Sequence, residues 1–157
     1  MSAPHARLLP LLLGLTLAAA LVGCDSFDDD YGDLAPGTFR FRAGKTTFVG
    51  TARFYPNTDR PLAAAAIILT PPNGPEMQFK ADAFIGAKRG SRIEPGIQFN
   101  PEGSVYDRQS GDVEITRVEA GNIAGRFRFR FKDVSIGPGA GGSITAEGGF
   151  NATLVPD

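Results

Sequence analysis

Hydrophobic and polar residues alternate along most of the chain after residue 37, as they do in β-strands that bury one face. In Thr38–Arg42 two phenylalanines fall on one face, whereas Arg40 and Arg42 fall on the other. Ala43-Gly44-Lys45 predicts a tight turn into a second strand, Thr46–Tyr55. The first elements are therefore expected to be an antiparallel pair with an aromatic inner face.

Two more strands are expected in the middle of the chain. Ala63–Thr70 begins with four alanines, which favour a helix, but its second half is rich in β-branched residues and two prolines follow it. This balance predicts a short buried strand. Met77 and Phe79 alternate with polar residues in the next strand.

Glycine and proline interrupt the pattern between Gly86 and Asp107, where we expect the longest loop, with short strands at Gly96–Phe99 and Ser104–Tyr106. Binding residues often lie on such loops. A second glycine-rich loop is expected at Gly137–Gly142, and it lacks the Gly-Lys-Ser/Thr end of a phosphate-binding loop. Ser143–Val155 is expected to form the closing strand.

The clearest hairpin joins two alternating segments, Gly111–Arg117 and Gly125–Lys132. The second segment places three phenylalanines on one face and three arginines on the other, namely Arg126, Arg128 and Arg130. Both segments bury their apolar face only if the numbers of paired residues sum to an even value, about 240 to 242. Asp112 and Glu114 then lie opposite two of the arginines, so the hairpin is expected to neutralise its own charges.

Many short strands joined by turns that contain glycine and proline predict an all-β fold. We expect an antiparallel β-barrel or β-sandwich of about eight strands, and the pattern fits a lipocalin-like barrel and a two-sheet sandwich equally. Three regions are expected: a signal peptide over 1–23, a lipidated cysteine with an acidic tether over 24–36, and a single β domain over 37–157.

The N-terminal region is apolar from residue 8 onward, but it is too short and too interrupted to form a membrane span of about 20 residues. It is typical of the hydrophobic part of a signal peptide. The residues that end it, Leu21, Val22, Gly23 and Cys24, resemble the bacterial lipobox. The resemblance implies cleavage before Cys24 and acylation of its sulfur and new amine, and two or more acyl chains hold a protein stably on a membrane. Because Cys24 is the only cysteine, no intramolecular disulfide is expected.

Residues 25–33 contain five aspartates, and such a run is expected to stay extended and solvated as a linker. It also resembles the surface-export signal of Bacteroidota lipoproteins, whereas Asp25 directly after the cysteine resembles the inner-membrane retention signal of enterobacteria. A calcium loop built on Asp28, Asp30 and Asp33 would lack the full twelve-residue ligand spacing. Outside this run the chain after residue 33 has 15 basic and 12 acidic residues, an excess too small to indicate nucleic-acid binding.

Three C-terminal segments resemble the ends of small Bacteroidota-type envelope lipoproteins of unknown function. Ser110–Thr116, Ile123–Phe129 and Ile144–Phe150 match motifs that read roughly Ser-Gly-x-Val-x-Ile-Thr, Ile-Ser-Gly-x-Phe-x-Phe and Ile-Thr-x-Gly-x-Phe. The chain departs from these motifs at Ala124 and at an extra glycine, Gly148. The resemblance implies a β fold and an envelope location, and it carries no catalytic residues.

Little catalytic chemistry is left in the mature chain. The single histidine, His5, would leave with the signal peptide, so the usual zinc sites and histidine-dependent triads are not expected. A glycosidase pair would have to come from four carboxylates, Glu76, Glu94, Glu102 and Asp107. We expect these to be solvated, and we expect neither enzymatic activity nor a metal or cofactor.

The arginines are stronger candidates for a functional site than the carboxylates. If Arg40 and Arg42 lie beside the three arginines of the hairpin, they form a cationic face for anionic sugars or lipid phosphates, unless acidic neighbours neutralise it. Tyr55 and Tyr106 are candidates to line a ligand site at a barrel mouth.

The sequence therefore predicts a membrane-anchored, non-enzymatic binding or accessory module of the cell envelope. The alternative is a structural or assembly lipoprotein that binds another envelope protein. An outer-membrane location is favoured over the inner membrane, with a glycan, a lipid or a protein as the partner.

Overall fold

The computed structural model describes residues 31, 33–56, 65–100, 106–134 and 141–156. Within these ranges, nine strands form one sheet in the order β5-β7-β8-β9-β1-β2-β3-β4-β6. The strands are β1 (Thr38–Ala43), β2 (Thr46–Tyr55), β3 (Ala66–Thr70), β4 (Met77–Lys80), β5 (Arg92–Ile93), β6 (Gly96–Phe99), β7 (Tyr106–Glu119), β8 (Asn122–Asp133) and β9 (Ser143–Leu154), and a short 3-10 helix, η1 (Asp82–Phe84), follows β4.

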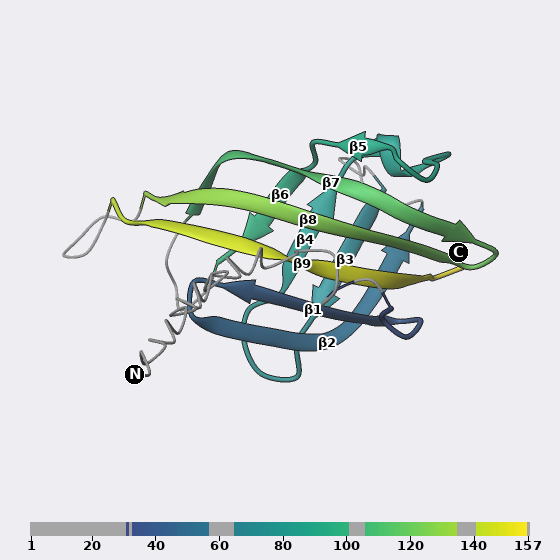
Figure 1. The fold of residues 1–157 in the computed structure, drawn as a ribbon, viewed down its shortest axis with the longest axis horizontal. Helices are drawn as coiled ribbons and strands as arrows, with labels where there is room; N and C mark the ends of the chain where they lie inside the picture. Colours follow the sequence, from purple (N-terminus) through teal and green to yellow (C-terminus); the bar gives the residue numbers. More distant parts are fainter. Residues whose placement is uncertain (1–30, 32, 57–64, 101–105, 135–140, 157) are drawn as a thin grey trace, which may run out of the picture.

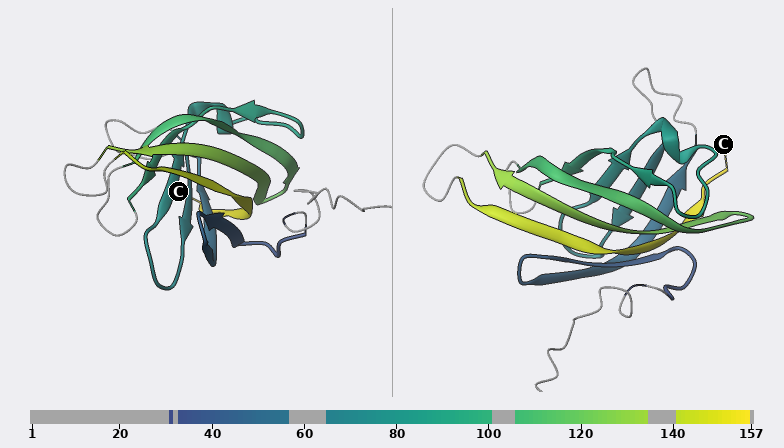
Figure 2. Two further views of the ribbon diagram at one scale, coloured as in Figure 1. Left: turned by 60° about the vertical axis from the view of Figure 1, so that its left-hand side comes forward. Right: turned by 45° about the horizontal axis from the view of Figure 1, so that its top comes forward.

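The sheet curls into a half-barrel, with β7, β8, β9 and β1 in front of β3, β4 and β6 in Figure 1, and the end-on view in Figure 2 shows the curl. Its pairings are antiparallel apart from a two-residue parallel contact between β2 and β9. β5 and β6 stand at opposite ends of the strand order, although only Glu94 and Pro95 separate them in the chain. The predicted all-β fold is confirmed, and it takes the form of one curled sheet.

Phenylalanine fills the interior of the half-barrel. Rings from opposite walls meet there: Phe79 of β4 lies 4.9 Å from Phe127 of β8, and Phe99 of β6 lies 5.9 Å from Phe131, measured between ring centroids. Nine phenylalanines of the described chain are at most 2 % exposed: Phe39, Phe41, Phe79, Phe84, Phe99, Phe127, Phe129, Phe131 and Phe150. Because burying each ring contributes about 1.5–3 kcal/mol, this cluster is the main source of stability.

Gly148 makes room for this packing. It lies on β9 opposite Phe41 of β1 on one side and Phe127 of β8 on the other. A Cβ at this position would overlap the side chain and backbone of Phe41. Its absence lets the Phe41 and Phe127 rings approach to 5.9 Å, so the extra glycine of the C-terminal motif has a packing role.

The β7–β8 hairpin has the predicted register. Asp112 lies opposite Arg128, and Glu114 lies opposite Arg126. The register shifts on either side of this stretch, once between Arg108 and Ser110 and once further along β7. The alternation therefore predicts the register at the centre of the hairpin, whereas it does not predict the two register shifts on either side.

The other strand predictions agree with the structure except between Gly86 and Asp107. There the predicted short strand Gly96–Phe99 is confirmed as β6, but β5 and the start of β7 at Tyr106 replace parts of the expected loop. β5 was missed because two residues are too few to show alternation, yet Ile93 is buried and paired with β7. Parts of three predicted elements, at 63–64, 104–105 and 137–140, lie outside the described residues.

Candidate functional site

The predicted arginines lie on the outer face of the half-barrel, on β8 and β1. β9 lies between these strands, so the two groups are one strand apart. Two rows cross the three strands: Arg126, Gly149 and Arg40 in one, and Arg128, Glu147 and Arg42 in the next. The strand pairing thus brings together four of the five arginines that the sequence singled out, and the fifth, Arg130, lies opposite Thr145 in the following row.

Glu147 lies at the centre of the second row. Its carboxylate is 2.6 Å from Arg42 and 3.4 Å from Arg128, and its side chain is only 13 % exposed. The sequence pattern did not single out this residue, because its role depends on β9 lying between β8 and β1. One half-buried carboxylate therefore binds one arginine from each neighbouring strand.

Carboxylates also flank the arginines on the β7 side. Glu114 lies 3.3 Å from Arg126, as the hairpin register predicts. Arg92 of β5, which was not predicted, lies 3.5 Å from Asp112 and 3.3 Å from Glu114. Charges of opposite sign therefore alternate across the sheet from β5 to β1.

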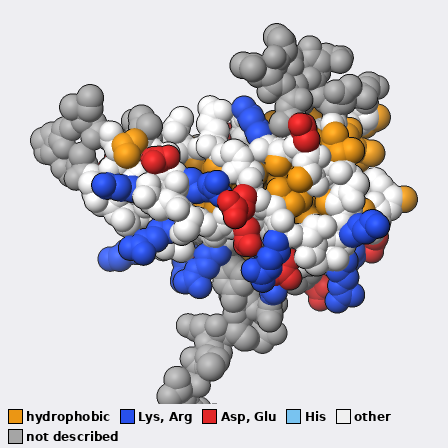
Figure 3. All heavy atoms as spheres, turned by 90° about the horizontal axis from the view of Figure 1, so that it is seen from above, with side chains coloured by type: hydrophobic (Ala, Val, Ile, Leu, Met, Phe, Trp, Pro, Cys, Tyr) orange, Lys and Arg blue, Asp and Glu red, His pale blue; other side chains and the backbone are white. Residues whose placement is uncertain are grey.

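We define the arginine face as six arginines and the three carboxylates among them: Arg40, Arg42, Arg92, Arg126, Arg128 and Arg130, with Asp112, Glu114 and Glu147. Among these described residues six arginines stand against three carboxylates, an excess of three positive charges, and Arg40 and Arg130 have no described carboxylate within 4.0 Å. Figure 3 shows basic side chains along one flank of the molecule, with acidic side chains among them. Neutralisation of the face is thus partial.

A shallow groove of about 590 Å³ crosses this face beside Gly111. Arg128 and Arg130 of β8 line it together with hydroxyl groups of β7 and β9, namely those of Ser110, Ser143 and Thr145. Guanidinium and hydroxyl donors of this kind suit an anionic oxygen ligand. Asp112 also lines the groove, which weakens that preference.

The segment before β1 packs on the outer surface of β9. A Cβ on Gly149 would come within 2.9 Å of the Cβ and carbonyl oxygen of Tyr31, so Tyr31 lies directly on this glycine. The Asn151 amide donates a hydrogen bond of 2.8 Å to the Leu34 carbonyl, and Asn151 is 1 % exposed. The Gly37 amide donates to the Asn151 carbonyl at 2.7 Å. The end of the predicted solvated tether is therefore a strap on the sheet, which we define as Tyr31 and residues 33–37.

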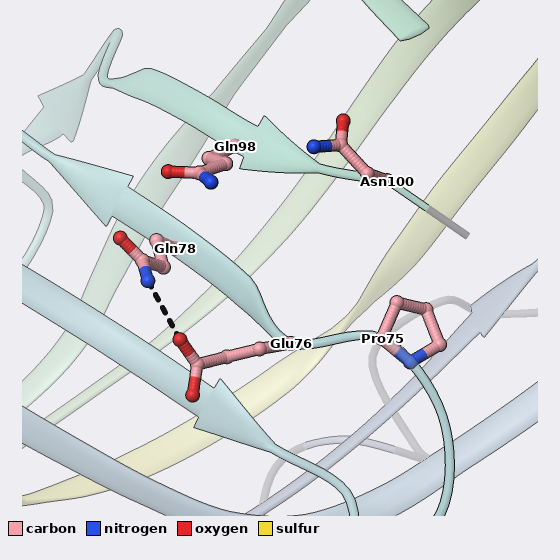
Figure 4. A pocket seen from close by; sticks show the side chains of 5 residues that line it. All are labelled: Pro75, Glu76, Gln78, Gln98 and Asn100. Carbon is pink, nitrogen blue, oxygen red and sulfur yellow. Dashed lines mark hydrogen bonds between the residues drawn. The ribbon is translucent and has the colours of Figure 1, made fainter. Parts of the chain in front are cut away.

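A small polar pocket of about 210 Å³ lies over the outer side of β4 and β6 (Figure 4). Gln78 and Gln98 are cross-strand partners in it, and Glu76 accepts hydrogen bonds from Gln78 at 2.6 Å and from Thr70 at 3.0 Å. Asn100 and Pro75 complete its lining. Amide and carboxylate groups are among the polar groups that orient ligands in pockets, but here the carboxylate already accepts hydrogen bonds from its neighbours.

An apolar groove of about 220 Å³ lies at one end of the half-barrel, between the η1 segment, the β7–β8 turn and the end of β9. Ile85, Val118 and Leu154 line it and are 59 %, 48 % and 37 % exposed. They are three of the five large hydrophobic side chains that are exposed in the described chain. Figure 3 shows hydrophobic side chains gathered toward one end of the molecule. The sequence pattern did not reveal this groove, because its residues come from four separate segments.

The carboxylates considered for a glycosidase pair occupy different surroundings. Glu76 lies in the polar pocket, Glu94 is 3.9 Å from Arg108, and Asp107 accepts a hydrogen bond from Gln109 at 3.2 Å. Glu102 lies outside the described residues. In the described ranges no three His, Cys, Asp or Glu side chains are grouped so that they could hold a metal ion.

Tyr55 and Tyr106, the candidates for a barrel-mouth site, lie on β2 and β7, which are not neighbours in the sheet. The Tyr106 ring packs 6.3 Å from that of Phe131. The lipobox residues Leu21, Val22, Gly23 and Cys24 lie outside the described part. Among the described residues, no helix has the length and apolar character that a membrane span requires.

Comparisons with known protein families, with curated proteins and with solved structures give no match.

Proposed function

We propose that the chain is a lipid-anchored envelope protein whose β domain binds another envelope protein and catalyses no reaction. The observation that carries the proposal is the way the half-barrel uses its apolar residues. Phenylalanines from both walls fill the interior. Recognition is therefore left to the outer surfaces, of which the apolar groove is the most suited to a protein partner.

The lipid anchor is tested by Cys24→Ser in the full chain, expressed in a bacterium that processes lipoproteins. We expect the parent to enter the detergent phase and the variant to remain unprocessed or soluble, because the acylated sulfur would be lost. Ser26→Ala is a control that should partition like the parent. Equal partitioning of parent and Cys24→Ser would contradict the anchor.

Protein binding is tested separately with photo-crosslinkers placed at Val118 or Ile85 in cells. The same partner should be captured from both positions, and it should be lost when Leu154→Asp places a charge in the apolar groove. A crosslinker at Thr70, which is exposed on β3, controls for random contact. If the chain is still anchored but forms no crosslinked adduct, the result would contradict protein binding and leave the lipid anchor standing.

An anionic glycan or lipid phosphate bound by the arginine face is the second candidate, and it would make the chain a ligand-binding accessory module. The excess of three positive charges on this face favours it. The apolar groove would then be dispensable. Binding of such a ligand that survives Leu154→Asp and is lost in Arg130→Gln would favour the second candidate.

A further inference from the structure

We propose that the groove on the arginine face binds a phosphate monoester group, which Arg130 of β8 holds together with hydroxyl groups of β7 and β9. The inference rests on the second candidate function, an anion bound by the arginine face, and it names the site and the chemical group. It does not depend on the lipid anchor or on the apolar groove. All residues of the three strands that form the site are described.

Carboxylates flank three of the four basic side chains on the outer face of β8. The cross-strand neighbours are Glu114 for Arg126, Asp112 and Glu147 for Arg128, and Asp107 for Lys132. The neighbours of Arg130 are instead Ser110 on β7 and Thr145 on β9. Arg130 is exposed and has no described carboxylate within 4.0 Å. Its guanidinium therefore keeps its donors for a ligand.

A bulge in β7 places Ser110 in this row. The register shifts between Arg108 and Ser110, so Gln109 has no cross-strand partner on β8. Gly111 follows with φ +119°, and a Cβ there would overlap the Arg128 carbonyl. Bulges turn side chains out of the regular alternation of a strand and are over-represented next to active sites. The bulge and Gly111 therefore shape the β7 wall of the groove.

The donors in the groove come from three strands. Arg130 supplies a positive charge from β8, and Arg128 adds another about 6.8 Å along the strand. Hydroxyl groups line both sides, from Ser110 on β7 and from Ser143 and Thr145 on β9. A phosphate monoester has three acceptor oxygens and a charge of about −1.5 to −2 at pH 7, so it can accept hydrogen bonds from the guanidinium and from both walls. A carboxylate has only two oxygens, in one plane, and matches this donor set less well.

Asp112 is the one carboxylate among the residues that line the groove. It lies opposite Arg128, in the row next to Arg130, and its carboxylate is 3.5 Å from Arg92 of β5. The negative charge near the ligand is therefore partly compensated. Asp112→Asn should tighten phosphate binding by about twofold, because it removes the remaining repulsion.

The site is tested with the full chain in non-ionic detergent micelles at low ionic strength and pH 8, titrated with inorganic phosphate. We expect saturable shifts of the amide NMR signals of Gly111, Arg130 and Thr145. Arg130→Gln should weaken binding at least about fivefold, because it removes the charge and its donors. Arg40→Gln is the matched control and should stay within about twofold of the parent. Arg40 is also exposed without a described carboxylate within 4.0 Å, but it does not line the groove.

Equal weakening by Arg130→Gln and Arg40→Gln would overturn the proposal. Phosphate would then be held by the diffuse charge of the arginine face, and the second candidate function would remain without this site. Leu154→Asp should bind phosphate like the parent, because Leu154 ends β9 whereas the groove lies near its start. Capture of a protein partner at Val118 or Ile85 is a separate result that Arg130→Gln should not change.

A second pair of variants distinguishes a built site from a single cation. Ser110→Ala combined with Thr145→Val should weaken binding of phosphate about threefold or more, because two hydroxyl donors are lost while every charge is kept. Binding of acetate should be weaker than that of phosphate in the parent and should change less in this variant. Phosphate binding that is unchanged in the double variant would overturn the proposal.

Phosphate monoesters are carried by sugars and by lipids, and the last experiment separates these sources. Glucose 6-phosphate is added to the solution in one arm, and phosphatidic acid is mixed into the detergent micelles in the other. Binding of either compound that is weakened by Arg130→Gln and kept in Arg40→Gln would support the site and identify its source. Binding of neither compound would overturn the proposal.

Discussion

Gly111 sets the local course of β7. It has φ +119°, a left-handed conformation, in the middle of a strand and opposite Phe129. A side chain at this position would meet the Arg128 carbonyl and the Phe129 ring. The adjacent register shift brings Arg108 opposite Phe131, where its guanidinium donates a hydrogen bond of 3.0 Å to the Gly111 carbonyl. One glycine therefore bends the strand and forms the floor of the groove on the arginine face.

Gly111→Ala should destabilise the domain by at least about 3 kcal/mol, because backbone strain and overlap with the neighbouring strand add together. Gly121→Ala is the matched control: it also has positive φ, at +82°, but a Cβ there meets nothing within 4 Å. That control should lose about 1–2 kcal/mol from strain alone. Urea unfolding measures both variants. Equal losses at the two positions would show that close packing at Gly111 contributes nothing.

At the scale of elements, the alternation of hydrophobic and polar residues predicted the properties that belong to a single strand or a single hairpin. The phenylalanine and arginine faces of β8 and its register with β7 follow from the period of two and from the charge pairs. The position of β9 between β8 and β1 does not follow, because strand order depends on contacts between distant segments. Glu147 and the strap on Gly149 were missed for that reason.

Glu147→Gln should lower the free energy of unfolding by about 1–2 kcal/mol, since Arg42 and Arg128 both lose a half-buried carboxylate. Asp112→Asn is the control. Its carboxylate is 37 % exposed and 3.5 Å from a single arginine, so the loss should be below about 0.5 kcal/mol. Unfolding in low and high salt distinguishes them, because only the Glu147 effect should persist when exposed pairs are screened. Similar losses of stability in both variants would mean that the specific ion pairs of Glu147 contribute no more than an exposed surface charge.

At the scale of the whole molecule, β9 joins the two halves of the sheet. It pairs with β8 along almost its whole length and with β1 over Ala146–Asn151, and it touches β2 at its end. β1 and β9 come from opposite ends of the domain, so their pairing closes a loop of more than a hundred residues. Such long-range pairing folds slowly, and the curled wall that carries the arginine face forms only after the last strand is in place.

The filled interior of the half-barrel predicts a large loss of stability when one of its rings is removed. Phe79→Ala should cost about 3–5 kcal/mol, because Phe79 contacts the rings of Phe127, Phe129 and Phe150 from the opposite wall. The cavity left behind is apolar, so benzene or xenon should bind the variant and raise its unfolding temperature. Phe48→Ala, at a half-buried ring stacked on Phe41, is the control and should cost less and bind neither. Saturable binding of either probe inside the parent protein would mean that the half-barrel has room for a small ligand, and recognition would then no longer have to take place on its outer surfaces.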